Sequence, residues 1–384
     1  MKLRPITPQP GNDRDPANFV GRAEMTERAR DHLRAGANLL LTDPRRMGKT
    51  FWMRTFAARE QSFHCYFIDY EGTNTVDDFL IKTAEALVTD RSLPAKARKQ
   101  LKTIFDNCEI TLSKGPLAIK SYFRQTSPHD LLNRVLASLE KDDSKTIPVV
   151  MMDEVPMAIA NIADREGPSS AEEVLQTLRA LRQGTSRIRW IITGSVGFHH
   201  VLRRINTTQG VLNDLESLPL GPLPHNEAEE LASRLLLGVE QPPIESVVDE
   251  LVKVTGGIPF LLRSVVKTLG ERHESVIKPR DVRECFEGFI DDPDEFNWFE
   301  HCLTRIPPNY GTHARIADKI LRRTLSEANS WVPIDSLASD EEAFATLDDL
   351  IKDHYLERQG LSVRWRYPAL QYIWARKKGV WDRR

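Results

Sequence analysis

The sequence lacks any long hydrophobic run. Its apolar stretches are far shorter than the roughly 20 residues that a membrane-spanning helix needs. The opening segment, MKLRPITPQPGNDRDP, contains no apolar region of the kind found in signal peptides. We therefore expect a protein without a membrane segment or a secretory leader, located in the cytoplasm.

Cysteine is also scarce, and neither sign of charge is in clear excess. The four cysteines are scattered and match no metal-binding spacing, so we expect reduced thiols rather than a disulfide framework. Lysine and arginine number 53 against 55 aspartates and glutamates, which leaves a net charge of -2. Nothing global attracts the chain to nucleic acid or to a membrane, although a local basic patch could still do so. The length of 384 residues allows two or three domains.

A phosphate-binding loop is predicted within Leu39–Thr50, which reads LLLTDPRRMGKT. An apolar strand stops there, a basic turn follows, and Lys49 and Thr50 open an amphipathic helix whose N-terminus can bind anions. Gly48 would let the backbone approach a phosphate, Lys49 would reach the β- and γ-phosphates, and the Thr50 hydroxyl would ligate Mg²⁺. An ordinary basic turn is the alternative. The predicted nucleotide-binding residues are Asp43, Pro44, Arg45, Arg46, Met47, Gly48, Lys49 and Thr50.

The loop departs from the usual GxxxxGK[ST] pattern at Asp43, which stands where the first glycine belongs. A carboxylate repels a triphosphate unless it points away. We therefore expect Asp43 to face a flanking loop while Arg45 and Arg46 keep the rim of the site positive.

A Gly-Arg step precedes the first predicted helix, which spans residues 23–35. Gly21 and Arg22 could place a guanidinium near the nucleotide, because arginine binds phosphate with paired hydrogen bonds. A solvated arginine at a helix start is the alternative.

The segment Ile147–Glu154, IPVVMMDE, is predicted to be a strand buried on both faces of a parallel sheet. It ends in two acids at the sheet edge where the loop would lie. Asp153 would hold Mg²⁺, and Glu154 would orient and deprotonate the attacking water. An acidic turn that caps the next helix is the alternative.

A further strand, residues 187–194, leads to hydroxyl residues that could sense the γ-phosphate. Thr193 and Ser195 are the candidates, and Ser195 is the predicted catalytic residue of the two. A plain turn after the strand is the alternative. With strands expected at 63–70 and 215–220, the pattern indicates an α/β fold with five parallel strands, spanning residues 19–222.

Within this core we expect an exposed insertion at 90–126. Outside it we expect an N-terminal arm at 1–18, helices only at 223–290, a linker at 291–311 and a winged helix at 312–384. In the helical part, a TGGIP turn places Pro259 at a helix start, where it could press against an adenine ring. A simple corner between helices is the alternative.

The predicted third helix of the winged-helix segment, residues 341–353, is mostly acidic, whereas the wing and the C-terminal tail are rich in arginine and lysine. An acidic helix has the wrong sign for the major groove. Any DNA contact would therefore run through wing and tail to phosphates, without base readout.

Several short motifs together resemble those of the prokaryotic STAND and archaeal-type AAA ATPases, relatives of the Orc/Cdc6 initiators, over nearly the whole chain. They are FVGR (19–22), DPRRMGKT (43–50), VVMMDE (149–154), ITGS (192–195), PLGPL (219–223), TGGIPFLL (255–262) and WRYPAL (365–370). The resemblance implies a P-loop ATPase core of the additional-strand type, a helical lid and a C-terminal winged helix. It also implies that Arg22 and Pro259 contact nucleotide.

We accordingly expect an enzyme that binds ATP with Mg²⁺ and hydrolyses it slowly, as a switch that controls conformation or assembly with a protein partner or with itself. A DNA-associated regulator or initiator-like ATPase is one alternative. A nucleotide-binding scaffold with negligible turnover is the other, and it rests on family analogy alone.

Overall fold

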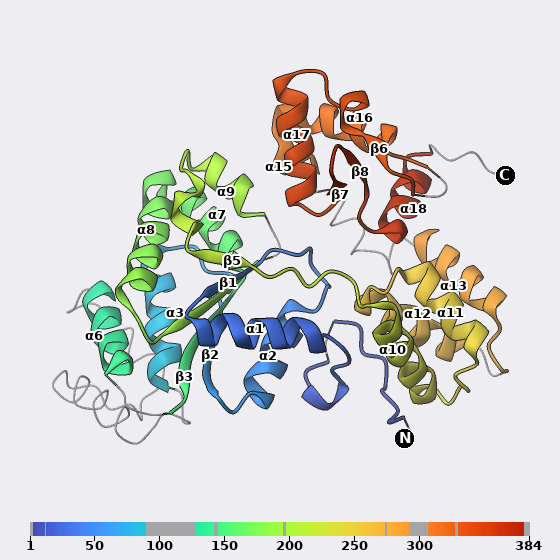
Figure 1. The fold of residues 1–384 in the computed structure, drawn as a ribbon, viewed down its shortest axis with the longest axis horizontal. Coiled ribbons are helices and arrows are strands. Elements are labelled where there is room, and N and C mark those ends of the chain that lie inside the picture. Colours follow the sequence, from blue (N-terminus) through green and yellow to red (C-terminus); the bar gives the residue numbers. More distant parts are fainter. Residues whose placement is uncertain are drawn as a thin grey trace. The chain divides into compact units, whose positions relative to one another are not determined.

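The computed structural model describes residues 3–11, 13–89, 128–141, 145–194, 197–272, 275–291, 304, 306–326 and 329–379 (Figure 1). The chain divides into two compact units. We call Ala23–Thr42 with Trp52–Pro219 the sheet unit, and Met1–Arg22 with Asp43–Phe51 and Leu220–Arg384 the helical unit. Ser195, the 90–126 insertion and most of the 291–311 linker lie outside the described residues.

The sheet unit is built on a parallel sheet of five strands in the order β2-β3-β4-β1-β5. Their bounds are β1 Asn38–Leu41, β2 Phe63–Asp69, β3 Ile147–Asp153, β4 Arg189–Thr193 and β5 Leu215–Ser217. This confirms the predicted α/β class. β4 lies between β1 and β3. Because the strands are parallel, β1, which precedes the loop, and β3, which precedes the acids, end at the same edge of the sheet.

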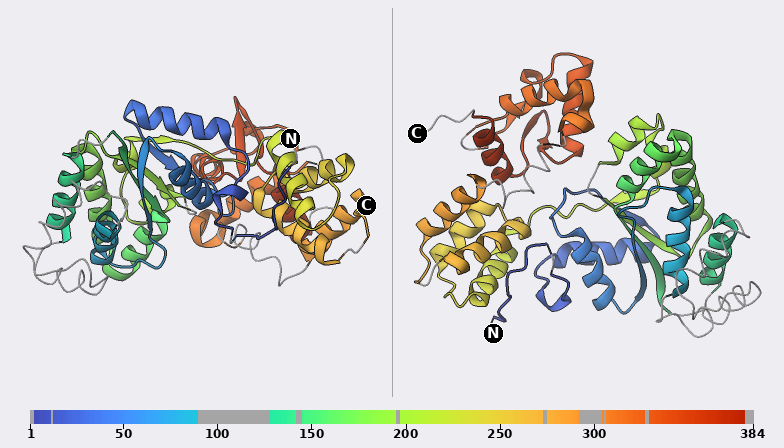
Figure 2. Two further views of the ribbon diagram at one scale, coloured as in Figure 1. Left: turned by 90° about the horizontal axis from the view of Figure 1, so that it is seen from below. Right: turned by 180° about the vertical axis from the view of Figure 1, so that it is seen from behind.

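Helices cover both faces of this sheet (Figure 2). One core joins alternate β3 and β4 residues, such as Met152 and Trp190, to the helices that follow β2 and β3. On the other face, α1 packs on β1, and Trp52 and Phe56 of α2 are buried. The helices are α1 Ala23–Ala35, α2 Lys49–Arg59, α3 Val76–Thr89, α6 Pro128–Glu140, α7 Val155–Glu166, α8 Pro168–Gly184 and α9 Phe198–Arg204, with the 3₁₀ turn η3 Gln209–Leu212.

The helical unit contains a bundle of four α-helices in its 225–291 part: α10 His225–Gly238, α11 Glu245–Thr255, α12 Pro259–Arg272 and α13 Pro279–Asp291. The N-terminal arm, which carries the short 3₁₀ turn η1 Pro16–Asn18, belongs to the same unit. Ile6 is buried in its core and donates its N–H to the Arg234 carbonyl (2.9 Å). The arm is therefore an ordered part of this unit.

The C-terminal part of the helical unit combines helices with a small antiparallel sheet. Its antiparallel sheet has the order β6-β8-β7, from β6 Val332–Pro333, β7 Leu356–Gln359 and β8 Ser362–Trp365. Its helices are α15 Ile306–Tyr310, η4 Gly311–His313, α16 Ala314–Arg323, η5 Ile334–Ser336, α17 Glu341–Lys352 and α18 Pro368–Lys377. Trp365 and Trp374 are fully buried with ring centroids 5.6 Å apart, so they form core rather than a stacking platform.

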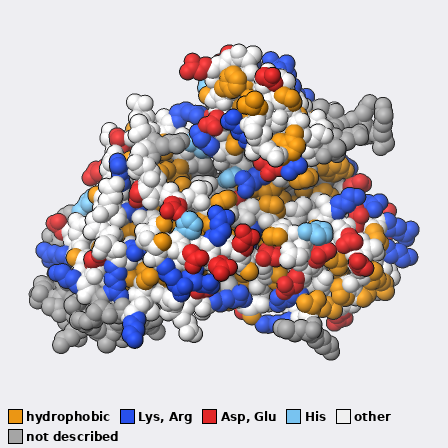
Figure 3. All heavy atoms as spheres, in the orientation of Figure 1, with side chains coloured by type: hydrophobic (Ala, Val, Ile, Leu, Met, Phe, Trp, Pro, Cys, Tyr) orange, Lys and Arg blue, Asp and Glu red, His pale blue; other side chains and the backbone are white. Residues whose placement is uncertain are grey.

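Over the described residues, no helix is both long and apolar enough to cross a membrane. Acidic and basic side chains are interspersed on the face shown in Figure 3, in keeping with the nearly balanced charge of the sequence.

Candidate functional site

The loop between β1 and α2 leads through Gly48 into the N-terminus of an α-helix. Gly48 adopts φ 93°, and a Cβ placed there would have no heavy atom within 4 Å. Lys49 is buried and donates its ammonium to the carbonyls of Pro44 (2.9 Å) and Asp43. Thr50 is exposed at the second position of α2. The loop thus presents open backbone at the N-terminus of an 11-residue helix, with one lysine held across it.

Asp43 is turned away from the interior of this loop. Its side chain is fully buried, and its carboxylate accepts hydrogen bonds from the backbone N–H of Leu220 (2.6 Å) and Gly221 (3.0 Å). Burial by itself would raise the pKa of Asp43. The nearby His354, the Leu220 N–H, Lys49 and the Gly221 N–H outweigh burial and lower the pKa below its usual value. Asp43 therefore stays ionised and holds the segment that follows β5.

Arg22 is buried beneath the same loop. Its guanidinium donates to the carbonyls of Gly221 (2.7 Å), Pro222 (3.1 Å), Met47 (3.3 Å) and Leu220. Burial lowers the pKa of Arg22 to about 10, against the opposing effect of nearby acids, so it remains charged at neutral pH. In this arrangement the arginine ties the loop to residues 220–222, and its predicted contact with nucleotide stays a prediction.

The backbone at Gly21 and Arg22 is in the left-handed region, with φ 78° and 65°. Glu227 of α10 accepts the Arg22 N–H (2.8 Å), and a Cβ at Gly21 would lie 2.5 Å from the Glu227 carboxylate. A non-glycine residue with positive φ is held in place by its surroundings. This turn therefore aims the Arg22 side chain at the loop.

Pro259 begins α12 in the turn that the sequence predicted. The turn is anchored because Leu223 donates its N–H to the Gly257 carbonyl (2.9 Å), and a Cβ at Gly257 would lie 2.7 Å from the Leu223 carbonyl. Next along α12, the Phe260 ring lies 4.9 Å below the Arg46 guanidinium carbon. The loop and the start of α12 are thus in direct contact within the helical unit.

The remaining loop side chains have different surroundings. Arg46 is exposed with φ 70°, Arg45 is half-buried, and Met47 is buried in the core of the helical unit. Only backbone atoms of Met47 are therefore available to a ligand, whereas Arg45 and Arg46 can supply positive charge at the rim.

The N-terminal arm also reaches this region, and the sequence did not reveal it. Asp13 forms an almost fully buried ion pair with Arg263 of α12 (2.8 Å), and Arg263 also donates to the Asn18 carbonyl (3.0 Å). Phe19 packs edge-on against Phe51 at the start of α2, with centroids 5.1 Å apart. The pairing joins residues 250 positions apart, a separation at which local patterns carry no signal.

In the sheet unit, the two predicted acids end β3. Asp153 is buried, and its carboxylate accepts the Glu154 N–H (3.0 Å). Glu154 is in the left-handed conformation, with φ 57° and ψ 31°, immediately before α7. This uncommon conformation in a non-glycine residue turns the chain sharply at the strand end, a feature that is frequent at functional sites.

Thr193 ends β4, between the ends of β1 and β3. It is fully buried, and its hydroxyl has no hydrogen-bond partner among the described residues. A buried hydroxyl without a partner calls for a ligand, an ion or a water molecule. Thr193 is therefore the strand-end hydroxyl that the structure singles out, whereas Ser195 is not described.

Two residues of the C-terminal part approach Asp43, and the sequence did not single out either one. Arg366, which directly follows β8, lies 3.8 Å from the Asp43 carboxylate. Its guanidinium also meets Nδ1 of His354 (2.6 Å), and burial lowers the pKa of His354 to about 4, so the imidazole is neutral and accepts this bond. The one sequence feature that could have pointed to these residues is Asp43 itself, because a buried carboxylate in this loop needs a compensating charge nearby.

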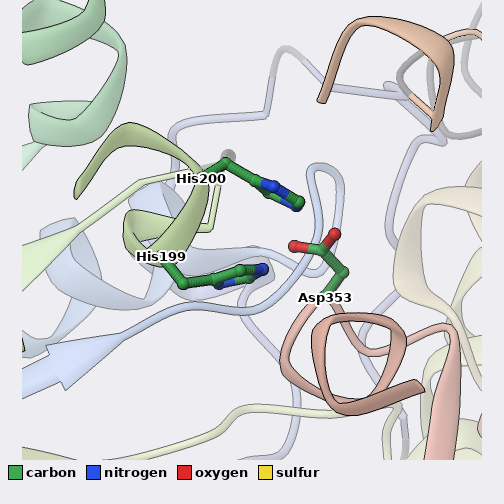
Figure 4. Close-up of side chains that lie close together, drawn as sticks. All are labelled: His199, His200 and Asp353. Carbon is green, nitrogen blue, oxygen red and sulfur yellow. The ribbon is translucent and has the colours of Figure 1, made fainter. Parts of the chain in front are cut away.

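Three further side chains are drawn in Figure 4. His199 and His200 lie in α9 of the sheet unit, with ring centroids 4.1 Å apart. Asp353 follows α17 in the helical unit, where it accepts a hydrogen bond from the Tyr310 hydroxyl (2.7 Å). Each of these residues thus has a packing role within its own unit.

The five-stranded parallel sheet, with a glycine-lysine-threonine loop after its first strand, matches the fold of P-loop ATPases. The chain is similar in structure to a Walker-type ATPase of Pyrococcus abyssi, at 17% identity and a TM-score of 0.63, over 97% of this chain and 98% of that one. No family model and no curated protein matches the sequence.

Two more distant structures also align along most of their length. They are the RuvB Holliday junction branch migration motor of Thermotoga maritima (12% identity, 98% of this chain and 100% of that one, TM-score 0.45) and the ORC2 protein of Aeropyrum pernix (15%, 96% and 97%, 0.44). Similarities this weak carry no argument about the present chain.

Proposed function

We propose that this protein binds ATP with Mg²⁺ and hydrolyses it slowly, as a switch whose nucleotide state controls its conformation or its association with a partner. The observation that carries the proposal is the sheet order. β1 leads into the loop, β3 ends at Asp153 with Glu154 directly after it, and β4 between them ends in Thr193, whose buried hydroxyl has no partner among the described residues. The ends of parallel strands at such an edge are where α/β proteins bind ligands.

The residues present fit a nucleotide and its metal ion. The open backbone at Gly48 and the start of α2 suit phosphate oxygens, and Lys49 can exchange its two carbonyl partners for a phosphate. Thr50 and Asp153 supply a hydroxyl and a carboxylate, the oxygen ligands that Mg²⁺ prefers. When bound, the ion would neutralise charge on the phosphates.

Hydrolysis also needs a group that takes a proton from water. Glu154 is our candidate base, because it is the second acid at the end of β3 and its left-handed backbone turns the chain there. Thr193 is our candidate for the hydroxyl that responds to the terminal phosphate, in preference to Ser195. Arg45 and Arg46 would add positive charge at the rim.

The proposed switching rests on what contacts the loop within the helical unit. Arg22 links the loop to residues 220–222, and Arg46 contacts Phe260 beside Pro259 at the start of α12. A change in the loop would therefore reach residues 220–222, which precede the bundle, and α12 within the bundle. We retain the five-part division inferred from the sequence (1–18, 19–222, 223–290, 291–311 and 312–384) as part of this proposal.

Paired substitutions test the enzyme assignment. Lys49→Ala should lose binding of a fluorescent ATP analogue, whereas the exposed Lys141→Ala should not. Glu154→Gln should bind ATP as the wild type does but release phosphate at least about 100-fold more slowly, the scale of a lost general base. Glu173→Gln, which changes an exposed helix position, is its matched control. Wild-type turnover by Glu154→Gln would overturn the base assignment, and negligible wild-type turnover with tight binding would favour the scaffold alternative.

The DNA-associated alternative draws on the wing. α17 exposes Glu341, Glu342 and Asp348, while Arg364 of the wing pairs with Glu357 (2.5 Å). This arrangement favours a protein partner or a second copy of the chain over the major groove of DNA. Duplex retention in a salt titration from low ionic strength would support the alternative, and a mass measurement with and without ATP and Mg²⁺ tests for nucleotide-dependent assembly.

A further inference from the structure

The aspartate in the phosphate-binding loop raises a problem of charge. Asp43 is fully buried and ionised, directly in the loop proposed to receive a triphosphate. The Leu220 and Gly221 N–H groups bond its two oxygens, but they carry no net charge. Lys49 donates to main-chain carbonyls, and the proposed function commits it to phosphate. Arg22 interacts electrostatically with Asp43, but its guanidinium donates to main-chain carbonyls rather than to the carboxylate. A buried carboxylate in this position is stabilised by a cation directly beside it.

Arg366 is placed to be that cation. Its Nη2 atom lies 3.8 Å from Oδ1 of Asp43, and a Cβ at Gly221, whose N–H bonds the same oxygen, would lie 3.6 Å from Nη2. The other end of the guanidinium, Nη1, is fixed on Nδ1 of His354 (2.6 Å). The Arg366 side chain is only 22% exposed, so water screens the pair weakly.

We propose that Arg366 is a positioning residue of the phosphate-binding loop, which compensates the charge of Asp43 and thereby lets the loop accept a nucleoside triphosphate. The inference rests on the proposed nucleotide binding and adds a condition to it. The loop binds nucleotide well only while the C-terminal segment that carries Arg366 is docked on it. Because binding equilibria are reciprocal, bound nucleotide in turn favours docking of that segment.

A double-mutant cycle tests this inference on the full-length protein. The four proteins are the wild type, Arg366→Gln, Asp43→Asn and the double variant, and the measured quantity is the Kd of a non-hydrolysable ATP analogue with Mg²⁺. Arg366→Gln should weaken binding about 10- to 100-fold, the range of a coupled, partly buried charge pair. In the Asp43→Asn background the same change should cost less than about threefold, because the charge that Arg366 compensates is gone.

Two further variants separate positioning from general damage. Arg364→Gln removes an arginine of β8, two positions before Arg366, that pairs with Glu357 rather than with the loop, and should leave Kd unchanged. Arg366→Lys keeps the charge and should bind within about threefold of the wild type if charge is what matters. Circular dichroism on each variant confirms that it is folded.

The outcomes distinguish the two proposals. If the wild type fails to bind nucleotide, the proposed function is wrong. If the wild type binds but Arg366→Gln costs nothing, or costs the same in both backgrounds, the inference about Arg366 is wrong while the proposed function stands. If Arg366→Gln does not fold, Arg366→Lys carries the test: a loss of affinity well beyond threefold that is the same in the Asp43 and Asp43→Asn backgrounds would overturn the inference.

Discussion

Arg22 offers the sharpest test of whether the structure or the sequence motif describes this region better. The sequence suggests a guanidinium that binds phosphate, whereas the structure buries it against four backbone carbonyls, those of Leu220, Gly221, Pro222 and Met47. Arg22→Met keeps much of the volume of the side chain and removes every donor. If the structural role dominates, the variant loses stability even when no nucleotide is present.

The magnitude follows from the hydrogen bonds. A bond from a charged donor contributes about 1.5–3 kcal/mol, and a buried acceptor left without a partner costs about 1–3 kcal/mol. These costs do not add fully, because one guanidinium serves all four carbonyls and burial of its charge is itself unfavourable. We expect a net loss of about 3–5 kcal/mol, which lowers Tm by roughly 6–20 °C for a unit of this size.

Thermal unfolding followed by circular dichroism, without nucleotide, measures this loss. Arg22→Lys should fall between the wild type and Arg22→Met, because an ammonium can serve fewer of the carbonyls at once. Arg28→Met on the exposed side of α1 is the matched control and should change stability by less than about 0.5 kcal/mol. An unchanged Tm for Arg22→Met together with lost nucleotide binding would refute our reasoning and restore the phosphate-binding role.

Three further changes have effects that the structure fixes in sign. The pKa of His354 is lowered to about 4 in the folded protein, so the unfolded chain binds more protons between about pH 6.5 and 4. Lowering the pH from about 6.5 to 4 should therefore reduce the free energy of unfolding by up to about 3 kcal/mol. His354→Gln should flatten the pH dependence of the urea midpoint. Gly194→Ala would place a methyl group in the ring of Pro156 and should cost about 1–3 kcal/mol, which an unchanged urea midpoint would contradict. Arg182→Met would leave Asp214, now bonded at 2.7 and 2.8 Å, without its buried partner; we expect a loss of about 3–5 kcal/mol by chemical denaturation, and a loss below 1 kcal/mol would show that water replaces the pair.

Local order along the chain was readable from the sequence because it depends on neighbouring residues. The first helix was predicted at the residues where α1 lies, Ala23–Ala35, and the apolar run at 147–154 became β3 with its two acids at the strand end. The glycine-lysine-threonine turn marked the start of α2 at Lys49. Apolar periodicity, glycine and strand-ending acids act within a few residues, so a pattern suffices to place them.

Some local structure was not predicted from the sequence. No helix was predicted at residues 155–166, where α7 starts directly after Glu154, although a turn capping the next helix was the alternative considered for the two acids. The left-handed conformation is uncommon for residues other than glycine, and the packing of α7 against the sheet helps to hold Glu154 in it. The catalytic assignment at this edge remains a prediction, whereas the backbone geometry around it is a property of the folded chain.

The partners of the buried charges were decided by tertiary structure alone. The sequence predicted only that Asp43 turns away from the phosphates, and it did not indicate which of 53 lysines and arginines would lie beside it. Folding brought Arg366 beside it and directed Arg22 to carbonyls about 200 positions away. A local pattern determines which groups a segment offers, and the cost of burying a charge determines that each must find a partner. Which partner is found depends on long-range contacts that no short stretch of sequence encodes.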